Sequence, residues 1–365
     1  MPGLHPNVID DLVLAQLPKV RKKYFDTQQI VRYVGVREIA MRGETASPTG
    51  QNYTEHWRWR RSAAGGPQPN LPFKATAAHY GQYMAAASIG WCLNVDKNFV
   101  MDLLVLENNR GGEKIFSYMS GQYSAQREGI NNWLEAQVWG IPQNASDAAN
   151  MHGALTWARR SMNSSGTFVS QPAVAFNGTY QTWGDGTTTG TLANVDCTSA
   201  LNERFRNPVA TYSGSVDETL LDLVLDMVDA MQWNPLSDLE GDFSIGEQVQ
   251  FWPNKKALAY KKLVNKGNDD RGRNGVGDFF PIRKTTAAGG NMIAVPYLDN
   301  YSWNPILFVD RSMLKLRKAS GRWDNTNPKE KFPGSHTSYY IPTDFNGQIW
   351  TEIPRHSIGL LHSSF

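Results

Sequence analysis

The sequence predicts an α+β fold, and three observations lead to this prediction. Residues 36–95 read as extended, with alternating side chains and a Gly/Pro break within them. Apolar residues at helical spacing follow at 113–138 and again from residue 215. From residue 292 onward the chain again has the composition of strands. Strands and helices therefore occupy separate stretches of one chain.

The composition indicates a globular protein that is rich in aromatic residues. Of the 365 residues, 41% are hydrophobic and only 19% are charged, and 12 Trp, 15 Phe and 14 Tyr argue against a disordered chain. A net charge of +2 demands neither a nucleic acid nor a membrane as partner. The two cysteines, Cys92 and Cys197, exclude a disulfide scaffold and a zinc site made of cysteines alone.

We expect neither a membrane span nor a secretion signal. The longest uncharged stretch worth testing, residues 75–95, contains His79, Gln82 and Asn94 and is rich in alanine. The first six residues lack the basic and apolar regions of a signal peptide. The protein is therefore expected to stay in a reducing cytoplasm until whatever it builds is released.

The N-terminal 35 residues have little apolar periodicity and contain a basic cluster with Arg21, Lys22 and Lys23. Residues 1–80 hold 11 Lys/Arg and 6 Asp/Glu, whereas the rest of the chain holds 25 and 28. Two interpretations carry about equal weight: a solvated tail, or a mobile arm that lies on an acidic neighbour.

Residues 36–95 are expected to form a long two-stranded hairpin. Residues 53–60 alternate, with Trp57 and Trp59 on one face and Arg58 and Arg60 on the other. Residues 62–67 break the chain, and a second extended stretch follows at 73–84. Because an isolated hairpin is only marginally stable in water, this one needs a neighbour to lie on.

Three helices are expected in the middle of the chain. The first covers about 113–139, is close to 40 Å long at about 1.5 Å per residue, and ends before Pro142. The second begins with a capping-box pattern from Ser215 to Glu218 and stops before Pro235. The third is shorter and runs from near Pro253 through Lys262.

Short strands are expected elsewhere. Residues 141–213 are rich in Ser, Thr, Asn and Gly, and a structureless loop of that length is improbable inside a compact domain. Residues 306–309 read as a buried strand, and residues 349–353 alternate and read as a further strand.

The sequence contains no coherent catalytic constellation. Residues 184–189 look like the nucleotide-binding turn of chaperonins, but no amphipathic helix follows, so we interpret them as a Gly/Thr loop. The seven histidines show no metal-ligand spacing, and residues 269–271 are interpreted as a solvated turn. We therefore expect no enzyme activity, no cofactor and no metal site.

Residues 57–61 interleave aromatic and basic side chains, a pattern that can stack the bases of single-stranded nucleic acid. No second segment of this kind supports a binding groove. The favoured interpretation is a strand with one packed face, whose basic face pairs with carboxylates of a partner.

Taken in order, the basic arm, long hairpin, long helix, second helix and terminal strands resemble tailed-bacteriophage major capsid proteins of the Hong Kong 97 (Johnson) fold. The resemblance covers roughly residues 20–360, and residues 141–213 fit it least. It is carried by weakly matching segments in the right order: residues 115–140 with Leu134-Glu135-Ala136-Gln137-Val138-Trp139-Gly140, residues 202–216, residues 251–258, residues 295–310, and residues 344–359.

The resemblance implies a domain organisation. It comprises an N-terminal arm (1–35), an extended hairpin loop or E-loop (36–95), a peripheral domain (96–214) with a spine helix at about 113–139 and an insertion or decorated loop at 141–213, an axial domain (215–329), and strands that return to the peripheral domain (330–365).

The resemblance also implies a function and partners. The chain would self-assemble through pentamers and hexamers into an icosahedral shell in the virion, put together in the host cytoplasm, around double-stranded DNA that it meets through non-specific charge contacts. The implied partners are further copies of itself, a separate scaffolding protein, a portal and cement proteins, with no membrane. Lys74 is the only lysine of region 45–90 and has no evident isopeptide partner, so cross-linking is not expected.

The residues that this function would use are contacts between subunits: Trp57, Arg58, Trp59 and Arg60 in the hairpin, and Arg21, Lys22 and Lys23 in the arm.

The sequence leaves two alternatives to a capsid protein open. One is another virion protein, such as a decoration or portal-associated protein, and the other is a soluble hydrolase with a His/Asp site assembled in space. The long hairpin and basic arm favour the capsid protein, because a monomeric enzyme has no need of them.

Overall fold

The computed structural model describes most of the body of the chain. The described residues are 33–46, 52–57, 85–97, 100–102, 112–142, 147–158, 160–161, 180–181, 191–193, 195–196, 205, 207–231, 247–269, 285–287, 290–327, 330–331, 333–334, 338–351 and 353–363.

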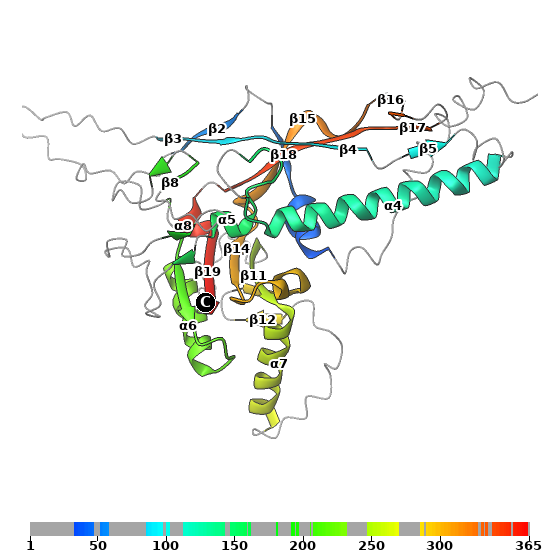
Figure 1. The fold of residues 1–365 in the computed structure, drawn as a ribbon. Coiled ribbons are helices and arrows are strands. Elements are labelled where there is room, and N and C mark those ends of the chain that lie inside the picture. Colours follow the sequence, from blue (N-terminus) through cyan, green and yellow to red (C-terminus); the bar gives the residue numbers. More distant parts are fainter. Residues whose placement is uncertain are drawn as a thin grey trace, which may run out of the picture.

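One half of the molecule consists of a long helix beside a four-stranded sheet (Figure 1). Helix α4 (Gly112–Trp139) has 28 residues, which corresponds to about 42 Å at 1.5 Å per residue. Its bounds agree with the expected helix to within a residue. The sheet has the order β1 (Glu44–Ala46), β15 (Leu314–Thr326), β18 (Thr343–Thr351), β4 (Cys92–Asp96).

Helix α4 buries a single stripe of side chains, as its apolar spacing predicted. Met119, Tyr123, Ile130, Leu134 and Val138 are all buried and recur every four or seven residues. Towards the sheet, the ring of Trp133 lies 6.2 Å from that of Phe345 on β18. The stripe thus fixes the helix along the sheet.

Strand β18 includes residues 349–351 of the predicted strand. Ile349, Trp350 and Thr351 are all buried. They are buried because a second segment, residues 152–157, packs on the sheet face that carries Gln348 and Trp350. The ring of Trp157 lies 5.3 Å from that of Trp350, edge to face.

The other half of the molecule is built on a six-stranded sheet. Its order is β10 (Val209–Tyr212), β19 (Ile358–Ser363), β14 (Ile306–Asp310), β11 (Gln248–Pro253), β13 (Gly290–Val295), β12 (Thr285–Ala287). Helices α6 (Glu218–Ala230) and α7 (Asn254–Asp269) cover one face, and the end of α4 lies towards the other, where Trp139 meets Phe251 at 5.1 Å. The buried strand expected at 306–309 is confirmed as β14.

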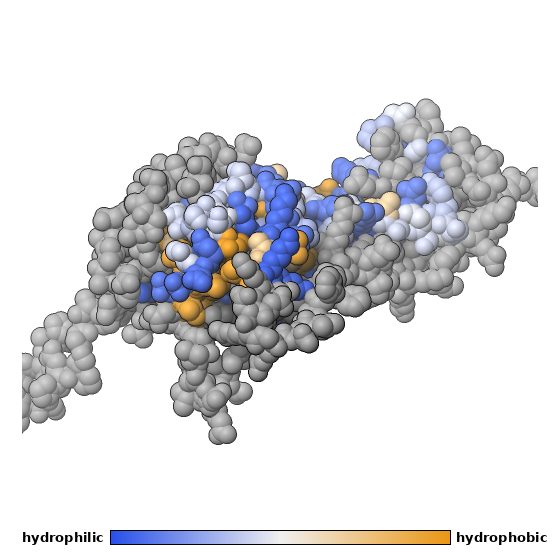
Figure 2. Space-filling view, turned by 90° about the horizontal axis from the view of Figure 1, so that it is seen from below, coloured by the Kyte–Doolittle hydropathy of each residue, from blue (hydrophilic) through white to orange (hydrophobic). Residues whose placement is uncertain are grey.

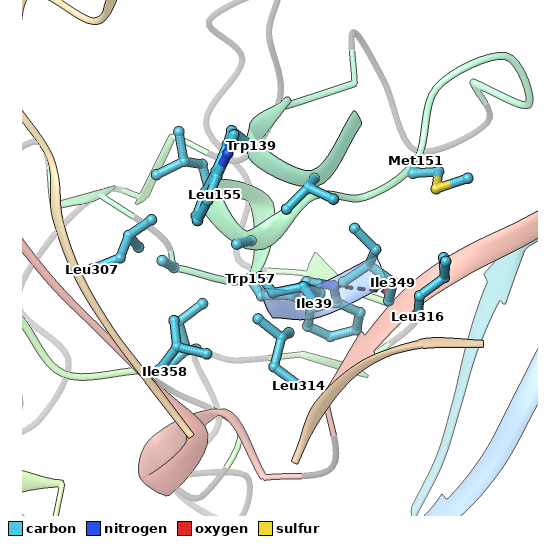
Figure 3. Packing of buried hydrophobic residues seen from close by; sticks show 14 of the residues in the cluster. Ile39, Trp139, Met151, Leu155, Trp157, Leu307, Leu314, Leu316, Ile349 and Ile358 are labelled. Atoms are coloured by element: carbon cyan, nitrogen blue, oxygen red, sulfur yellow. Dashed lines mark hydrogen bonds between the residues drawn. The ribbon is translucent and has the colours of Figure 1, made fainter. Parts of the chain in front are cut away.

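Two hydrophobic clusters meet at this sheet. Neighbouring residues along a strand alternate between them: Leu360 of β19 belongs to the larger cluster and Leu361 to the smaller one under α6 and α7. Figure 3 shows the larger cluster, in which Trp157 donates from Nε1 to the carbonyl oxygens of His152 and Ile349, each at 3.1 Å. One face of the sheet therefore packs on the half that contains α4, and the other face packs on α6 and α7.

Short elements complete the described chain. The stretch 141–213 contains short strands, as expected, and one helical turn. These elements are η1 (Val36–Ala40), β2 (Asn52–Trp57), β3 (Ala85–Gly90), β5 (Val100–Asp102), α5 (Ala154–Trp157), β6 (Arg160–Ser161), β7 (Tyr180–Gln181), β8 (Thr191–Leu192), β9 (Val195–Asp196), η4 (Pro296–Asn300), β16 (Glu330–Lys331), β17 (Ser338–Tyr340) and α8 (Pro354–Ser357).

Two helix boundaries differ from the predictions. Asp217 rather than Ser215 caps α6, because its carboxylate accepts a hydrogen bond from the backbone N–H of Leu220 at 3.0 Å. Helix α7 continues to Asp269, seven residues beyond Lys262. The polar sequence Asn265-Lys266-Gly267-Asn268 hid this continuation, since it gives no apolar stripe.

Candidate assembly surface

The N-terminal segment is attached to α4 by polar side chains on that helix. The hydroxyl of Tyr33 donates to Asn132 Oδ1 at 3.0 Å. The backbone N–H groups of Gly35 and Val36 each donate to one carboxylate oxygen of Glu135, both at 3.0 Å. We call residues 33–46 the arm root, because they follow the stretch for which the sequence predicts an N-terminal arm.

Glu135 is buried and forms a third hydrogen bond, from Trp139 Nε1 at 2.7 Å. Burial raises the pKa of the Glu135 carboxyl above its ordinary value, although all three hydrogen bonds oppose that rise. Gly35 is required here, since a Cβ at this position would lie 2.7 Å from Trp139 Nε1. The root therefore depends on a few specific polar contacts.

A buried ion pair holds the next turn of the arm root. Glu38 of η1 pairs with Arg311, which follows β14, and both side chains are almost fully buried. Arg311 Nε also lies 3.5 Å from Glu247, whose carboxylate pairs with Arg42 at 2.5 Å. These charges connect the arm root to the start of β11 and the end of β14.

The last part of the arm root joins the four-stranded sheet. Strand β1 pairs in parallel with β15, and Glu44 forms ion pairs with Lys315 and Arg317. The hydrogen bond from Lys315, followed by the charge of Arg317, lowers the pKa of Glu44 below its ordinary value. Because Glu44 is exposed, solvent screens these pairs.

The hairpin is held differently. Strands β2 and β3 pair antiparallel from Asn52 opposite Gly90 to Trp57 opposite Ala85. The strand that returns to the body is thus β3, residues 85–90. The sequence predicted the second extended stretch at residues 73–84, which lie outside the described residues. We call residues 85–93 the hairpin root.

Backbone hydrogen bonds and apolar side chains attach the hairpin root to the body. Ser88 N–H donates to the carbonyl of Ala193 at 2.9 Å, and Leu93 N–H to that of Ala148 at 2.9 Å. The amide of Gln348 donates to the carbonyl of Gly90 at 2.8 Å. The buried side chains of this root, Ala87, Ile89, Trp91 and Cys92, all belong to the larger hydrophobic cluster.

The predicted contact residues fall almost entirely outside the described part of the chain. Trp57 is the last residue of β2, and only its backbone is described. Arg58, Trp59, Arg60, Arg21, Lys22 and Lys23 lie outside the described residues, as do residues 184–189. Their role between subunits stays a prediction.

Two buried side chains of the body are held uncharged at neutral pH. Burial lowers the pKa of His152 to about 4, so its ring is neutral at pH 7, and Nδ1 lies 3.0 Å from the amide nitrogen of Gln348. Burial raises the pKa of the Cys92 thiol to about 12, which keeps it protonated.

Among the described residues, no three His, Cys, Asp or Glu side chains gather as a metal site would require. No described helix is long and apolar enough to cross a membrane.

Sequence reasoning missed the residues that fix the arm root, Glu135, Glu38 and Arg311. One signal was available: Glu135 lies between Leu134 and Val138, on the apolar stripe of the helix, where a charged residue needs a partner. Glu38 and Arg311 are 273 residues apart in the sequence, so no local pattern reveals that they pair.

Three solved capsid structures match this fold along nearly the whole chain. The capsid asymmetric unit of cyanophage A-1(L) matches with a TM-score of 0.58 and 11% sequence identity, over 94% of this chain and 95% of that one. The capsid of a native GTA particle matches with a TM-score of 0.52 and 10% identity, over 94% and 92% of the two chains. The capsid of an empty GTA particle gives 0.51 and 11%, over 91% and 90%.

No protein-family model and no curated protein matches the sequence. At identities near 10%, the likeness shows a shared fold. The chain therefore has the α+β, Hong Kong 97-type fold of tailed-phage capsid proteins that the resemblance implied.

Proposed function

We propose that this chain is a viral major capsid protein that self-assembles through pentamers and hexamers into an icosahedral shell around double-stranded DNA. The observation that carries the proposal is the match to capsid structures over at least nine-tenths of both chains. A protein that used only part of this fold for another purpose would have no need to keep its full length.

The attachment of the two roots supports the same function. Both the arm and the hairpin start from fixed positions on the body, the arm from α4 and the hairpin from the edge of the body near Ala193. A shell subunit needs such fixed starting points, because its extensions have to reach the same place on every neighbour. Trp57, Arg58, Trp59 and Arg60 would contact one neighbour, and Arg21, Lys22 and Lys23 another.

The domain organisation of the proposal follows the resemblance, except at the limits of the axial domain, which would also take in residues 209–212 and 358–363. Strand β15 begins at Leu314 and pairs with β18 in the four-stranded sheet beside α4. This pairing favours an axial domain that ends near residue 313 rather than 329. The six-stranded sheet, with β10 and β19 among its strands, and helices α6 and α7 would then form the axial domain, and α4 would be the spine helix of the peripheral domain.

Electron microscopy of the expressed protein after a sizing column tests the proposal. The expressed protein, alone or mixed with the scaffolding protein of the same virus, is expected to form uniform icosahedral particles or flat rings of five and six subunits. A monomer or dimer that forms no particle at any salt concentration, even with that scaffolding protein, would contradict the proposal and favour the soluble hydrolase.

A double variant tests the proposed hairpin contact. Arg58→Glu with Arg60→Glu is expected to leave the subunit folded and to block shell formation, because the reversed charges repel the carboxylates of the neighbour. Arg322→Glu with Lys331→Glu, two exposed positions on β15 and β16, is the matched control and should assemble. Normal shell yield from the hairpin variant would remove these arginines from the contact.

A further inference from the structure

Helices α6 and α7 lie on the same face of the six-stranded sheet, towards opposite edges (Figure 1). Helix α6 packs on β10, at one edge, and α7 packs on β11 and β13, near the other. Both helices bury their apolar sides in the smaller hydrophobic cluster, where Val224 of α6 and Ala257 of α7 lie. Gly359 of β19 permits this packing, since a Cβ there would lie 2.7 Å from Met227 Sδ and Met231 Sδ.

The outer side of α6 is acidic with a leucine in the middle. Glu218, Asp222 and Asp226 are exposed and four residues apart, so they lie along one stripe of the helix. Leu225 lies on the same stripe and is 51% exposed. The helix contains neither lysine nor arginine.

The outer side of α7 has the same arrangement with the opposite charge. Lys255 and Lys262 are exposed, and Leu258 lies between them on the same stripe with 54% of its surface exposed. Figure 2, which views the molecule from the side of these helices, shows apolar and strongly hydrophilic residues next to one another on this face. Each helix thus exposes one leucine between two like charges.

These charges are not paired within the described part of the chain. Among the described residues, no ion pair involves Asp222, Asp226, Lys255 or Lys262. Two copies of α6 would repel each other, as would two copies of α7, whereas α6 and α7 attract. A leucine that is about half exposed on each helix provides apolar area for such a contact.

We propose that α6 of one copy packs against α7 of the next copy, with Leu225 against Leu258 and the flanking aspartates against the flanking lysines. The inference rests on the proposed function and names the surfaces that close its rings. Because the two helices lie towards opposite edges of one domain, the contact joins two different surfaces head-to-tail, and such a contact forms a ring where its rotation closes. The partner is a second copy, since a nucleic acid would bind α7 and leave the acidic stripe of α6 exposed.

Charge exchange tests the contact. Asp222→Lys with Asp226→Lys places lysines beside the exposed leucine of both helices (the basic copy), and Lys255→Glu with Lys262→Glu places carboxylates beside the exposed leucine of both (the acidic copy). Each double variant should yield at least tenfold fewer particles in sedimentation and electron microscopy, with an unchanged circular dichroism spectrum. The quadruple variant restores opposite charges on the two helices and should recover wild-type yield.

The controls separate this inference from the proposed function. If wild-type protein forms shells and either double variant does so equally well, the helix contact is wrong and the capsid function stands. If wild-type protein forms no shells with its scaffolding protein, the capsid function itself is wrong. Normal assembly of the Lys255/Lys262 variant with less DNA in its particles would assign α7 to nucleic acid and overturn the contact.

Mixing the two double variants gives a sharper result. A basic copy and an acidic copy can alternate around a ring, and alternation closes only in rings with an even number of subunits. The mixture should therefore form six-membered rings, without five-membered rings or closed shells. A mixture that forms no rings, or forms pentamers as readily as hexamers, would overturn the proposal.

Cysteine cross-linking tests the orientation of the contact. Leu225→Cys combined with Leu258→Cys should give, after oxidation, a ladder of cross-linked subunits up to six on a non-reducing gel. Leu225→Cys alone should give no more dimer than wild-type protein, which contains Cys92 and Cys197. Efficient dimer formation by the single variant would indicate contact between two α6 helices and would overturn the head-to-tail arrangement.

Discussion

The arm root and the hairpin root are both fixed to the body, but by different interactions. The arm root depends on a few buried charges, Glu135 and the Glu38–Arg311 pair, which hold backbone N–H groups and one another. The hairpin root depends on backbone pairing and on apolar side chains such as Ile89. A single substitution can therefore release the arm root, whereas the hairpin root loses stability in proportion to the apolar volume removed.

The largest expected effect comes from the buried ion pair of the arm root. Arg311→Met removes the buried partner of Glu38 and leaves only Arg37, which is more exposed, to pair with it, so the free energy of unfolding should fall by about 3–4 kcal/mol. Urea unfolding followed by tryptophan fluorescence measures it. Arg42→Met, at the more exposed end of the same cluster, should cost less than about 1 kcal/mol. Equal losses from both variants would show that burial does not set the strength of this cluster.

The hairpin root should respond to the loss of volume. Ile89→Ala removes buried methyl groups and should lower the free energy of unfolding by about 2–4 kcal/mol, with no dependence on pH between 5 and 8. Leu93→Ala, on the neighbouring strand but exposed, is the matched control and should change it by less than about 0.5 kcal/mol. A pH-dependent loss in Ile89→Ala would contradict a purely apolar root.

Glu135→Gln should have a smaller effect on the arm root. The amide keeps the shape but accepts with only one oxygen, so one buried N–H of Gly35 or Val36 loses its partner, at a cost of about 1–3 kcal/mol. Glu128→Gln, exposed on the same helix, serves as control. Hydrogen exchange at Gly35 and Val36 should accelerate in the first variant only, and unchanged exchange there would remove Glu135 from the root.

The contributions of Glu135 and Glu44 to the free energy of unfolding should change with pH in opposite directions. The pKa of Glu135 is raised in the folded protein, so its contribution to stability grows as pH falls through the folded value towards 4.5. The pKa of Glu44 is lowered, so its smaller contribution is present above 4.5 and is lost as pH falls through its folded value.

Urea unfolding of wild-type protein, Glu135→Gln and Glu44→Gln from pH 4 to 8 measures both contributions. The loss caused by Glu135→Gln should grow as pH falls towards 4.5, whereas the loss caused by Glu44→Gln should shrink below it. Losses that change in the same direction would contradict the assigned environments.

The part of the fold that the sequence predicted is the part that local patterns specify. The apolar stripe of α4 and the uninterrupted run of β14 each fix an element and its bounds. The alternation at residues 349–353 predicted a strand, but it gave no sign that Ile349, Trp350 and Thr351 are all buried, because the side chain that covers Trp350 is Trp157, from a segment with no pattern of its own. Local periodicity reports one face of a strand but not what packs on the other.

The arm root shows the same limit more strongly. The sequence drew attention to Arg21 and to the Trp57–Arg60 segment, which are prominent as clusters of charge and aromatic rings. The residues that fix the arm root are single charges, Glu38 and Arg311, which meet only after the chain has folded. An ion pair between two residues that are far apart in the sequence leaves no trace in the composition or in the spacing of residues.

Hydrogen–deuterium exchange on free subunits and on assembled shells tests the central claim, that both roots are fixed before assembly and only the extensions gain contacts from neighbours. Residues 33–46 and 85–93 should be protected equally in the two states, whereas residues 1–32 and 58–84 should become protected only in shells. Rapid exchange of both roots in free subunits, followed by protection in shells, would contradict this account.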